Sequence, residues 1–170
     1  SSAASDVYKR QMGNKLNAKN IADYFKSQQR KVDINTIYNY LNALDSAFVI
    51  QRIPRYDIKG KEILQTNEKY FVSDLSLIYS VMGYRDRLIG GMLENLVCME
   101  LKRRGYEVYV GKQDEKEVDF VAIRREEKIY VQVTYQLGLQ ATIDREFAPL
   151  LAIDDHYPKS VSYTHLTLPT

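Results

Sequence analysis

The chain has 170 residues, of which 45% are hydrophobic and 27% charged, and its formal net charge is +2. This is the composition of an ordinary globular protein with enough residues to bury a core; no apolar run reaches the roughly 18 residues of a membrane-spanning helix, and so small a net charge does not by itself indicate nucleic acid. The single cysteine, Cys98, excludes an intramolecular disulfide framework and a cysteine-based zinc site, and it predicts a reducing, cytoplasmic location. The lack of a long apolar run predicts that no membrane partner is involved.

The two ends of the chain differ in character from the rest. Residues 1–11 (SSAASDVYKRQ) and residues 160–170 (SVSYTHLTLPT) both resemble translated sequencing adapter. One transposon-end oligonucleotide accounts for both ends, forward for the first and as its reverse complement for the second. We therefore interpret 1–11 and 160–170 as adapter-derived tails and leave them out of the fold prediction. Residues 12–159 are then a natural fragment, cut at both edges, of the kind that metagenomic sequencing yields.

Two helices followed by a hairpin are predicted for the first half. Apolar residues recur with helical spacing over residues 17–28 and 34–44, and Asp33 can cap the second helix. Residues 48–53 predict a strand, residues 54–61 a turn region with Gly60 as its strongest signal, and residues 62–65 and 69–72 the returning strands. This outline is that of a winged helix-turn-helix, so residues 12–82 are predicted to form a winged-helix-like unit.

A winged-helix unit offers a defined set of candidate DNA contacts. In such a unit the second helix can enter the major groove while the hairpin contacts the backbone. The residues expected to meet bases or phosphates are Lys31, Asn35, Thr36, Asn39, Arg52 and Arg55. The exposed helix face is polar rather than basic, however, and Asp45 opposes DNA. Packing against a protein is therefore the alternative use of this face.

The second half predicts a helix with an embedded acid, followed by three strands. After Gly90-Gly91, the apolar run 92–101 is helical in spacing and contains Glu94, whose carboxylate needs a partner or a function there. Strands are expected over residues 106–111, 117–123 and 129–135.

Strand alternation then predicts which side chains share a face. A period of two places Glu117, Asp119 and Val121 on one face of the second of these strands, opposite Val118, Phe120 and Ala122. In the third strand the same period puts Gln132 and Thr134 on one face. Pairing of the two strands would bring Asp119 near Gln132 and Thr134, with Glu94 approaching from the helix.

This order of elements resembles the restriction-endonuclease-like fold of the PD-(D/E)xK superfamily. The resemblance implies that residues 83–159 form an α/β/α unit in which an acid and the (D/E)xK pair bind Mg²⁺ and orient a water. By position, Glu94 is the helix acid and Asp119 the metal acid, whereas the (D/E)xK pair falls on Gln132-Val133-Thr134. An amide is a weaker Mg²⁺ ligand than a carboxylate, and Thr134 carries no positive charge. We therefore predict a degenerate site, with at most a weak Mg²⁺ site at Glu94 and Asp119.

Motifs along the whole fragment resemble the C-terminal half of prokaryotic AAA-type ATP-binding proteins, whose C-terminal domain is of unknown function. They include EKYFVSDLSL at 68–77, GGMLENLVCMELKRRGYEVYVG at 90–111, KEVDFVAI at 116–123 and IYVQVTYQL at 129–137. The resemblance implies an N-terminal P-loop ATPase domain. The chain contains no G-x-x-x-x-G-K-[ST] motif, so ATP is expected to bind only in that domain, outside this fragment.

Together these observations predict an α/β protein, a winged-helix unit followed by a restriction-endonuclease-like α/β/α unit. The expected function is that of a C-terminal accessory module of an ATP-binding protein, binding DNA or a protein partner without catalysis. A Mg²⁺-dependent DNA nuclease and a module for protein–protein interaction only are the two alternatives, and whether the fragment is an enzyme is left open. The expected partners are the ATPase domain in cis, and DNA or a protein.

Overall fold

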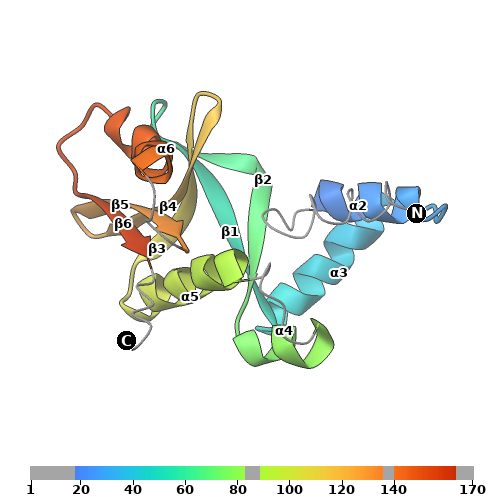
Figure 1. Cartoon of the computed structure of the whole chain (residues 1–170). Helices are drawn as coiled ribbons and strands as arrows, with labels where there is room; N and C mark the ends of the chain where they lie inside the picture. Colours follow the sequence, from blue (N-terminus) through green and yellow to red (C-terminus); the bar gives the residue numbers. More distant parts are fainter. Residues whose placement is uncertain (1–17, 83–88, 136–139, 164–170) are drawn as a thin grey trace.

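The computed structural model describes residues 18–82, 89–135 and 140–163, and within these ranges it is a mixed α/β structure (Figure 1). One sheet of six strands runs through it, in the order β2-β1-β3-β4-β5-β6. The elements are α2 (Ala18–Ser27), α3 (Ile34–Ser46), β1 (Ile50–Asp57), β2 (Glu62–Val72), α4 (Leu75–Met82), α5 (Ile89–Arg103), β3 (Glu107–Gln113), β4 (Lys116–Arg124), β5 (Glu127–Thr134), α6 (Gln140–Leu151) and β6 (Lys159–Tyr163).

The two helices predicted for the first half are present. Asp33 is the N-cap of α3, and its Oδ1 accepts a hydrogen bond of 2.7 Å from the backbone N–H of Asn35. The buried face of α3 carries Ile37 and Leu41, which pack with Ile50 and Tyr70 of the hairpin. α3 therefore packs against the β1–β2 hairpin, and α2 packs against α3.

The hairpin itself differs from the prediction. β1 continues through Pro54 to Asp57, where we expect a turn, and β2 is one strand of 11 residues rather than two short ones. Proline is accommodated because the register shifts between Ile53 and Arg55, so that its missing N–H falls at an irregular point of the ladder. β1 also pairs in parallel with β3. The hairpin that we assigned to a wing thus belongs to the same sheet as the second half.

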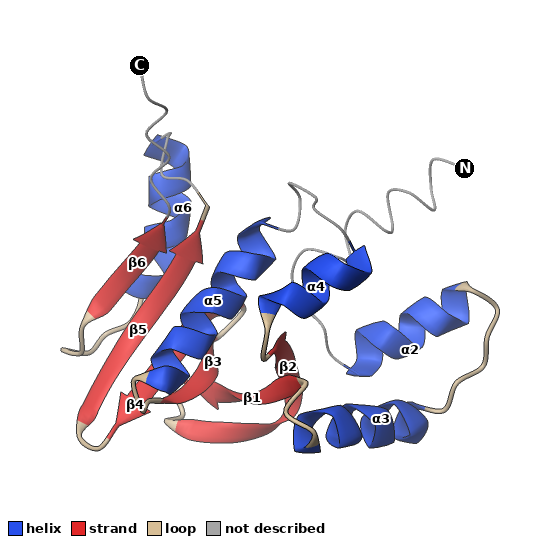
Figure 2. Ribbon diagram, turned by 90° about the horizontal axis from the view of Figure 1, so that it is seen from below, coloured by secondary structure: helices blue, strands red, loops and turns tan. Residues whose placement is uncertain are grey.

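Strands β3, β4 and β5 form an antiparallel meander, close to the predicted strand positions. α5 begins at Ile89, so Gly90 and Gly91 lie inside its first turn rather than before it. α5 covers one face of the sheet and α6 the other, on opposite sides of the strands in Figure 1, and Figure 2 shows β6 next to β5.

The structure adds α4, α6 and β6, three elements that we do not predict from the sequence. β6 pairs in parallel with β5, and four of its five residues, 160–163, belong to the segment that we interpret as an adapter-derived tail.

A bulge in β4 changes which of its side chains share a face. Tyr109 pairs with Val121 and Gly111 with Val118, so Val110 alone stands opposite two residues of β4. As a result Val118 and Val121 both pack in the cluster on the α6 side, whereas Phe120 packs on the α5 side. The prediction that Val118 and Val121 lie on opposite faces is wrong, because the extra residue interrupts the period of two.

The bulge leaves no room for a side chain at Gly111. A Cβ there would lie 2.9 Å from Val118 Cβ and 3.0 Å from both Ile58 Cδ1 and Val121 Cγ2. We expect Gly111→Ala to lower the free energy of unfolding by about 1–3 kcal/mol through overpacking, as measured by urea denaturation. Gly90→Ala is the control, because nothing lies within 4 Å of its Cβ position and alanine in a helix is favoured by roughly 0.5–1 kcal/mol. Equal stability of the two variants would contradict this account of the bulge.

Candidate functional site

Four charged side chains from four different elements meet under α5. They are Arg55 of β1, Lys69 of β2, Glu94 of α5 and Glu117 of β4, and we call them the Lys69 cluster. The side chain of Lys69 is only 5% exposed, and that of Glu117, the most exposed of the four, is 22% exposed. Charges so far from water are stable only when they are paired.

The cluster is held by short contacts of alternating sign. Lys69 Nζ lies 2.5 Å from Glu117 Oε1 and 3.8 Å from Glu94 Oε2. Arg55 Nη1 donates to Glu117 Oε2 at 2.7 Å, so both oxygens of this carboxylate contact a cation. The four formal charges cancel, and the two acids are neutralised inside the protein.

The surroundings of Glu117 stabilise its ionised form. Burial by itself raises the pKa of this carboxyl, but the attraction of Lys69 and the hydrogen bonds from Lys69 and Arg55 outweigh that effect. The pKa of Glu117 therefore lies below its ordinary value. The carboxylate stays charged in the folded protein at neutral pH and well into the acid range.

Asp119 and Gln132 lie next to each other on neighbouring strands. Asp119 Oδ2 accepts a hydrogen bond of 2.8 Å from the backbone N–H of Val133, and the N–H of Asp119 donates to Gln132 Oε1 at 3.3 Å. Val131 and Val133 pack in the cluster under α5. Strand alternation therefore directs Gln132 and Thr134 toward the opposite face, the one that α6 covers.

Glu94 belongs to the other face. It projects from α5 toward Lys69, 3.8 Å away, and Lys69 connects it to Glu117. The sequence predicts that the acid of the helix needs a partner, but it places that acid beside Asp119, Gln132 and Thr134 and misses Lys69. The signal in the sequence was a lysine within the strand motif EKYFV, where it interrupts an otherwise apolar face of the strand.

A second contact that we did not predict docks α5 onto β2. Asn95, which is buried, accepts a hydrogen bond of 2.8 Å from the N–H of Val72, and its Nδ2 donates to the carbonyl oxygen of Val72 at 2.8 Å. This two-point bond fixes the helix beside Glu94, so the acid approaches Lys69 from a rigid element.

The two predicted Mg²⁺ ligands, Glu94 and Asp119, already have other partners: Glu94 contacts the ammonium group of Lys69, and Asp119 accepts a hydrogen bond from the N–H of Val133. The ammonium group of Lys69 also contacts Glu117. In the parts of the chain that the structure describes, no three His, Cys, Asp or Glu side chains converge as metal ligands. Cys98 is fully buried, and burial raises the pKa of its thiol to about 12, so it is not a nucleophile at neutral pH.

The candidate DNA contacts separate into two groups. Lys31, Asn35, Thr36, Asn39 and Arg52 are exposed, as expected. Arg55 is not: its side chain is 11% exposed and binds Glu117, because β1 extends past Pro54 into the sheet. Arg55 is therefore not placed to contact phosphates.

Large apolar side chains are exposed beside the polar face of α3. Tyr40 is 69% exposed, Leu44 40% and Phe48 80%. Tyr40 and Leu44 lie one turn apart on α3, and Phe48 follows the end of the helix. Phe48 also has a φ of 57°, in the left-handed region that bulky residues rarely adopt. We call these three residues the α3 stripe.

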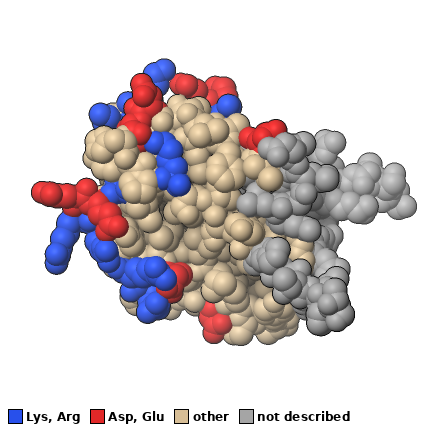
Figure 3. Space-filling view, turned by 60° about the vertical axis from the view of Figure 1, so that its left-hand side comes forward, with Lys and Arg blue, Asp and Glu red and all other residues tan. Residues whose placement is uncertain are grey.

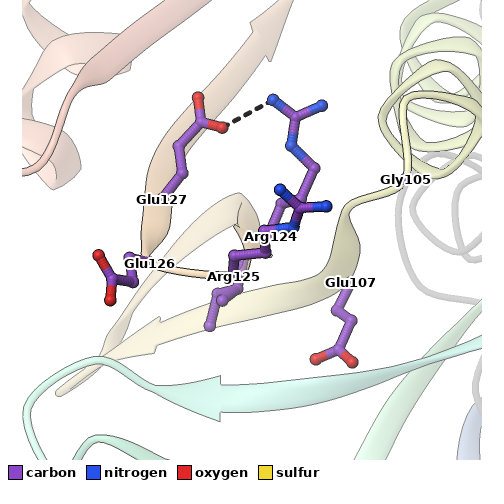
Figure 4. A pocket seen from close by; sticks show the side chains of 7 residues that line it. Gly105, Glu107, Arg124, Arg125, Glu126 and Glu127 are labelled. Atoms are coloured by element: carbon purple, nitrogen blue, oxygen red, sulfur yellow. Dashed lines mark hydrogen bonds and ion pairs between the residues drawn. The ribbon is translucent and has the colours of Figure 1, made fainter.

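A hollow at the turn between β4 and β5 measures about 1020 Å³. Figure 4 shows its lining side chains, with Arg124 directed at Glu127 across 2.8 Å. The same guanidinium lies 4.6 Å from the centre of the Tyr106 ring and donates to the carbonyl oxygen of Arg104. This arginine is thus engaged within the protein, and we do not take the hollow as the functional site.

Comparison with known proteins places the chain among proteins without an assigned function. The model of a family described as "Domain of unknown function (DUF8612)" matches residues 3–88. The chain is 38% identical over 148 residues to an uncharacterized protein of Haemophilus influenzae, a match that covers 87% of this chain and 36% of that protein. It is 34% identical over 129 residues to the uncharacterized protein MJ1544 of Methanocaldococcus jannaschii, covering 74% of this chain and 28% of the relative.

The chain therefore spans about a third of the length of the curated relatives that it matches. No solved structure matches it. None of the helices in the described ranges is both long and apolar enough to cross a bilayer.

Removal of the central acid tests the Lys69 cluster. We expect Glu117→Gln to destabilise the protein by about 2–3 kcal/mol at neutral pH, less than for fully enclosed pairs because Glu117 is partly exposed. Its folded pKa is lowered, so its stabilising effect is complete above the unfolded value of about 4.3 and is lost as the pH falls through the folded value. Denaturation curves at several pH values should therefore show the difference between wild type and variant shrinking in acid.

The exposed pair Arg124–Glu127 supplies the matched control for this measurement. Glu127→Gln also removes an ion pair, but its carboxylate is 47% exposed, so stability should change little at any pH. A Glu117→Gln variant as stable as Glu127→Gln would show that the cluster does not stabilise the fold.

Proposed function

Since this chain belongs to the family described as "Domain of unknown function (DUF8612)", we propose its role from the geometry: it is a non-catalytic accessory module of a longer prokaryotic AAA-type ATP-binding protein. The module uses the exposed side of α3 to bind a partner and carries a degenerate nuclease-like site. The resemblance of the motifs supports the AAA-type parent, and the greater length of the relatives supports a module within a longer protein.

The absence of hydrolysis is proposed from one observation, the position of Lys69. Its ammonium group contacts both Glu94, the acid of the helix, and Glu117, so these two carboxylates already bind a cation that belongs to the protein. Metal-assisted hydrolysis needs carboxylate oxygens that are free to bind the ion. The amide of Gln132 and the hydroxyl of Thr134 add neither a ligand of comparable strength nor a positive charge.

A protein surface is the partner that α3 fits best. Its sequence, INTIYNYLNALDS, contains no lysine or arginine, whereas DNA affinity depends on cations that neutralise phosphates. The α3 stripe exposes two aromatic rings, Tyr40 and Phe48, and aromatic anchors dominate protein interfaces. We propose that the remainder of the longer protein, including the expected ATPase domain, covers this stripe in cis.

DNA is the second candidate partner, because cations flank the polar side of α3. Lys31 precedes the helix and Arg52 lies on β1, both exposed, while Asn35 and Asn39 could contact base edges. On the face seen in Figure 3, which is turned away from α3, Lys and Arg side chains alternate with Asp and Glu along the margin. The absence of lysine and arginine from α3 itself favours the protein partner over the polyanion.

Binding in trans tests the protein partner. The part of the Haemophilus influenzae relative outside the matched segment is purified and titrated with the present chain by calorimetry. We expect Phe48→Ser and Tyr40→Ser each to weaken binding about 10-fold or more, as for aromatic anchors of an interface. Leu151→Ser is the matched control, because Leu151 is 76% exposed on α6, away from α3. Equal affinities for all three variants, or no binding by the wild-type chain, would exclude the α3 stripe as the interface.

Two assays on the same chain test the DNA-binding and nuclease alternatives. A DNA-binding module predicts an affinity for duplex DNA that falls steeply with salt and is weakened by Lys31→Ala or Arg52→Ala; fluorescence anisotropy measures it. A nuclease predicts Mg²⁺-dependent cleavage that is lost in Asp119→Asn, a change that preserves an acceptor for the N–H of Val133. We expect neither result, and cleavage by the wild-type chain would overturn the non-catalytic proposal.

A further inference from the structure

We infer that Lys69 is an internal counter-cation that takes the place of a divalent ion, so that removing its ammonium group turns Glu94 and Glu117 into a metal-binding pair. This inference extends the proposal that the module does not hydrolyse phosphodiesters, because it identifies the group that keeps metal out. It concerns the α5 side of the sheet and does not involve α3.

The geometry places one cation between two acids from different elements. Lys69 Nζ is 2.5 Å from Glu117 Oε1 and 3.8 Å from Glu94 Oε2. Both oxygens are therefore within reach of a single positively charged centre. Glu94 comes from a helix that Asn95 fixes to β2, and Glu117 comes from the middle of the sheet. Neither acid depends on a mobile loop for its position.

The charges of the cluster explain why the ion is excluded and what its removal would do. Arg55 and Lys69 balance Glu94 and Glu117 one to one. Without the ammonium group, both carboxylates would lose their contact with Lys69, Glu117 would keep Arg55, and the partly buried cluster would carry one positive charge less. Carboxylate oxygens are the ligands that Mg²⁺ and Mn²⁺ prefer, so a divalent ion is the species best suited to replace the lost charge.

Access to the cluster is also adequate for a small ion. The side chain of Lys69 is 5% exposed, but those of Glu94 and Glu117 are 13% and 22% exposed. A hydrated ion can reach these carboxylates from the side that water already touches and can keep some of its own waters, as Mg²⁺ usually does.

The test replaces Lys69 by methionine, which keeps the length of the side chain and removes its charge. Mn²⁺ is titrated into wild type and Lys69→Met, and binding is followed by the loss of the electron paramagnetic resonance signal of free Mn²⁺. We expect the variant to bind one Mn²⁺ at least 10-fold more tightly than the wild type does. Its thermal midpoint should rise with Mn²⁺ or Mg²⁺ concentration, because an ion that binds only the folded state stabilises it, whereas that of the wild type should not.

Two control variants make the result specific to the two carboxylates. Lys69→Met combined with Glu117→Gln should lose the Mn²⁺ affinity. Lys159→Met removes another partly buried lysine, one that binds the single carboxylate of Asp155 at 3.2 Å, and should acquire no Mn²⁺ site.

Four results would overturn the inference: Mn²⁺ binding by the wild type as tight as by Lys69→Met, a folded Lys69→Met that binds none, affinity that survives Glu117→Gln, or a Lys69→Met that stays unfolded when Mn²⁺ or Mg²⁺ is supplied. In the last case the ion would have failed to replace the ammonium group. The remainder of the Haemophilus influenzae relative is also titrated with Lys69→Met in the presence of Mn²⁺. Because this variant leaves the α3 stripe unchanged, its binding to the remainder tests the proposed partner independently of the metal site.

Discussion

The contact between Lys69 and Glu117 is the constraint on which the rest of the arrangement depends. It joins β2, an edge strand of the sheet, to β4 in its middle, and Glu94 adds α5 to the same group of charges. Charges this well buried are tolerable only if all of their partners arrive together. The hairpin of the first half and the strands of the second half are therefore bound into one sheet by polar contacts as well as by backbone pairing.

The local elements follow from local signals. Asp33 and the apolar spacing after it define α3, and the alternation of residues 106–135 defines β3, β4 and β5 with small shifts at their ends. The predictions that fail concern pairing between segments that are far apart in the sequence. The parallel pairing of β1 with β3 carries β1 through Pro54, and the bulge in β4 arises from its register against β3. Neither register is encoded in the period of a single segment, so neither was predictable from it.

The candidate site shows the same division. The acids Glu94 and Asp119 stand out in the sequence because each interrupts an apolar pattern, and both lie in polar contacts in the structure. Their partners were harder to predict, because the cation that faces Glu94 comes from β2, outside the segment 83–159 in which we expected the site. Arg55 illustrates the converse: an arginine next to a predicted turn looks exposed, but pairing of β1 on both sides places it inside.

One carboxylate oxygen of Asp119 accepts a hydrogen bond from the N–H of Val133, which a backbone carbonyl of the neighbouring strand would otherwise accept. The sheet therefore needs a hydrogen-bond acceptor at position 119 for structural reasons, independently of any phosphate chemistry. Backbone pairing alone is enough to explain an aspartate in this place, so its presence in a strand does not by itself identify a nuclease.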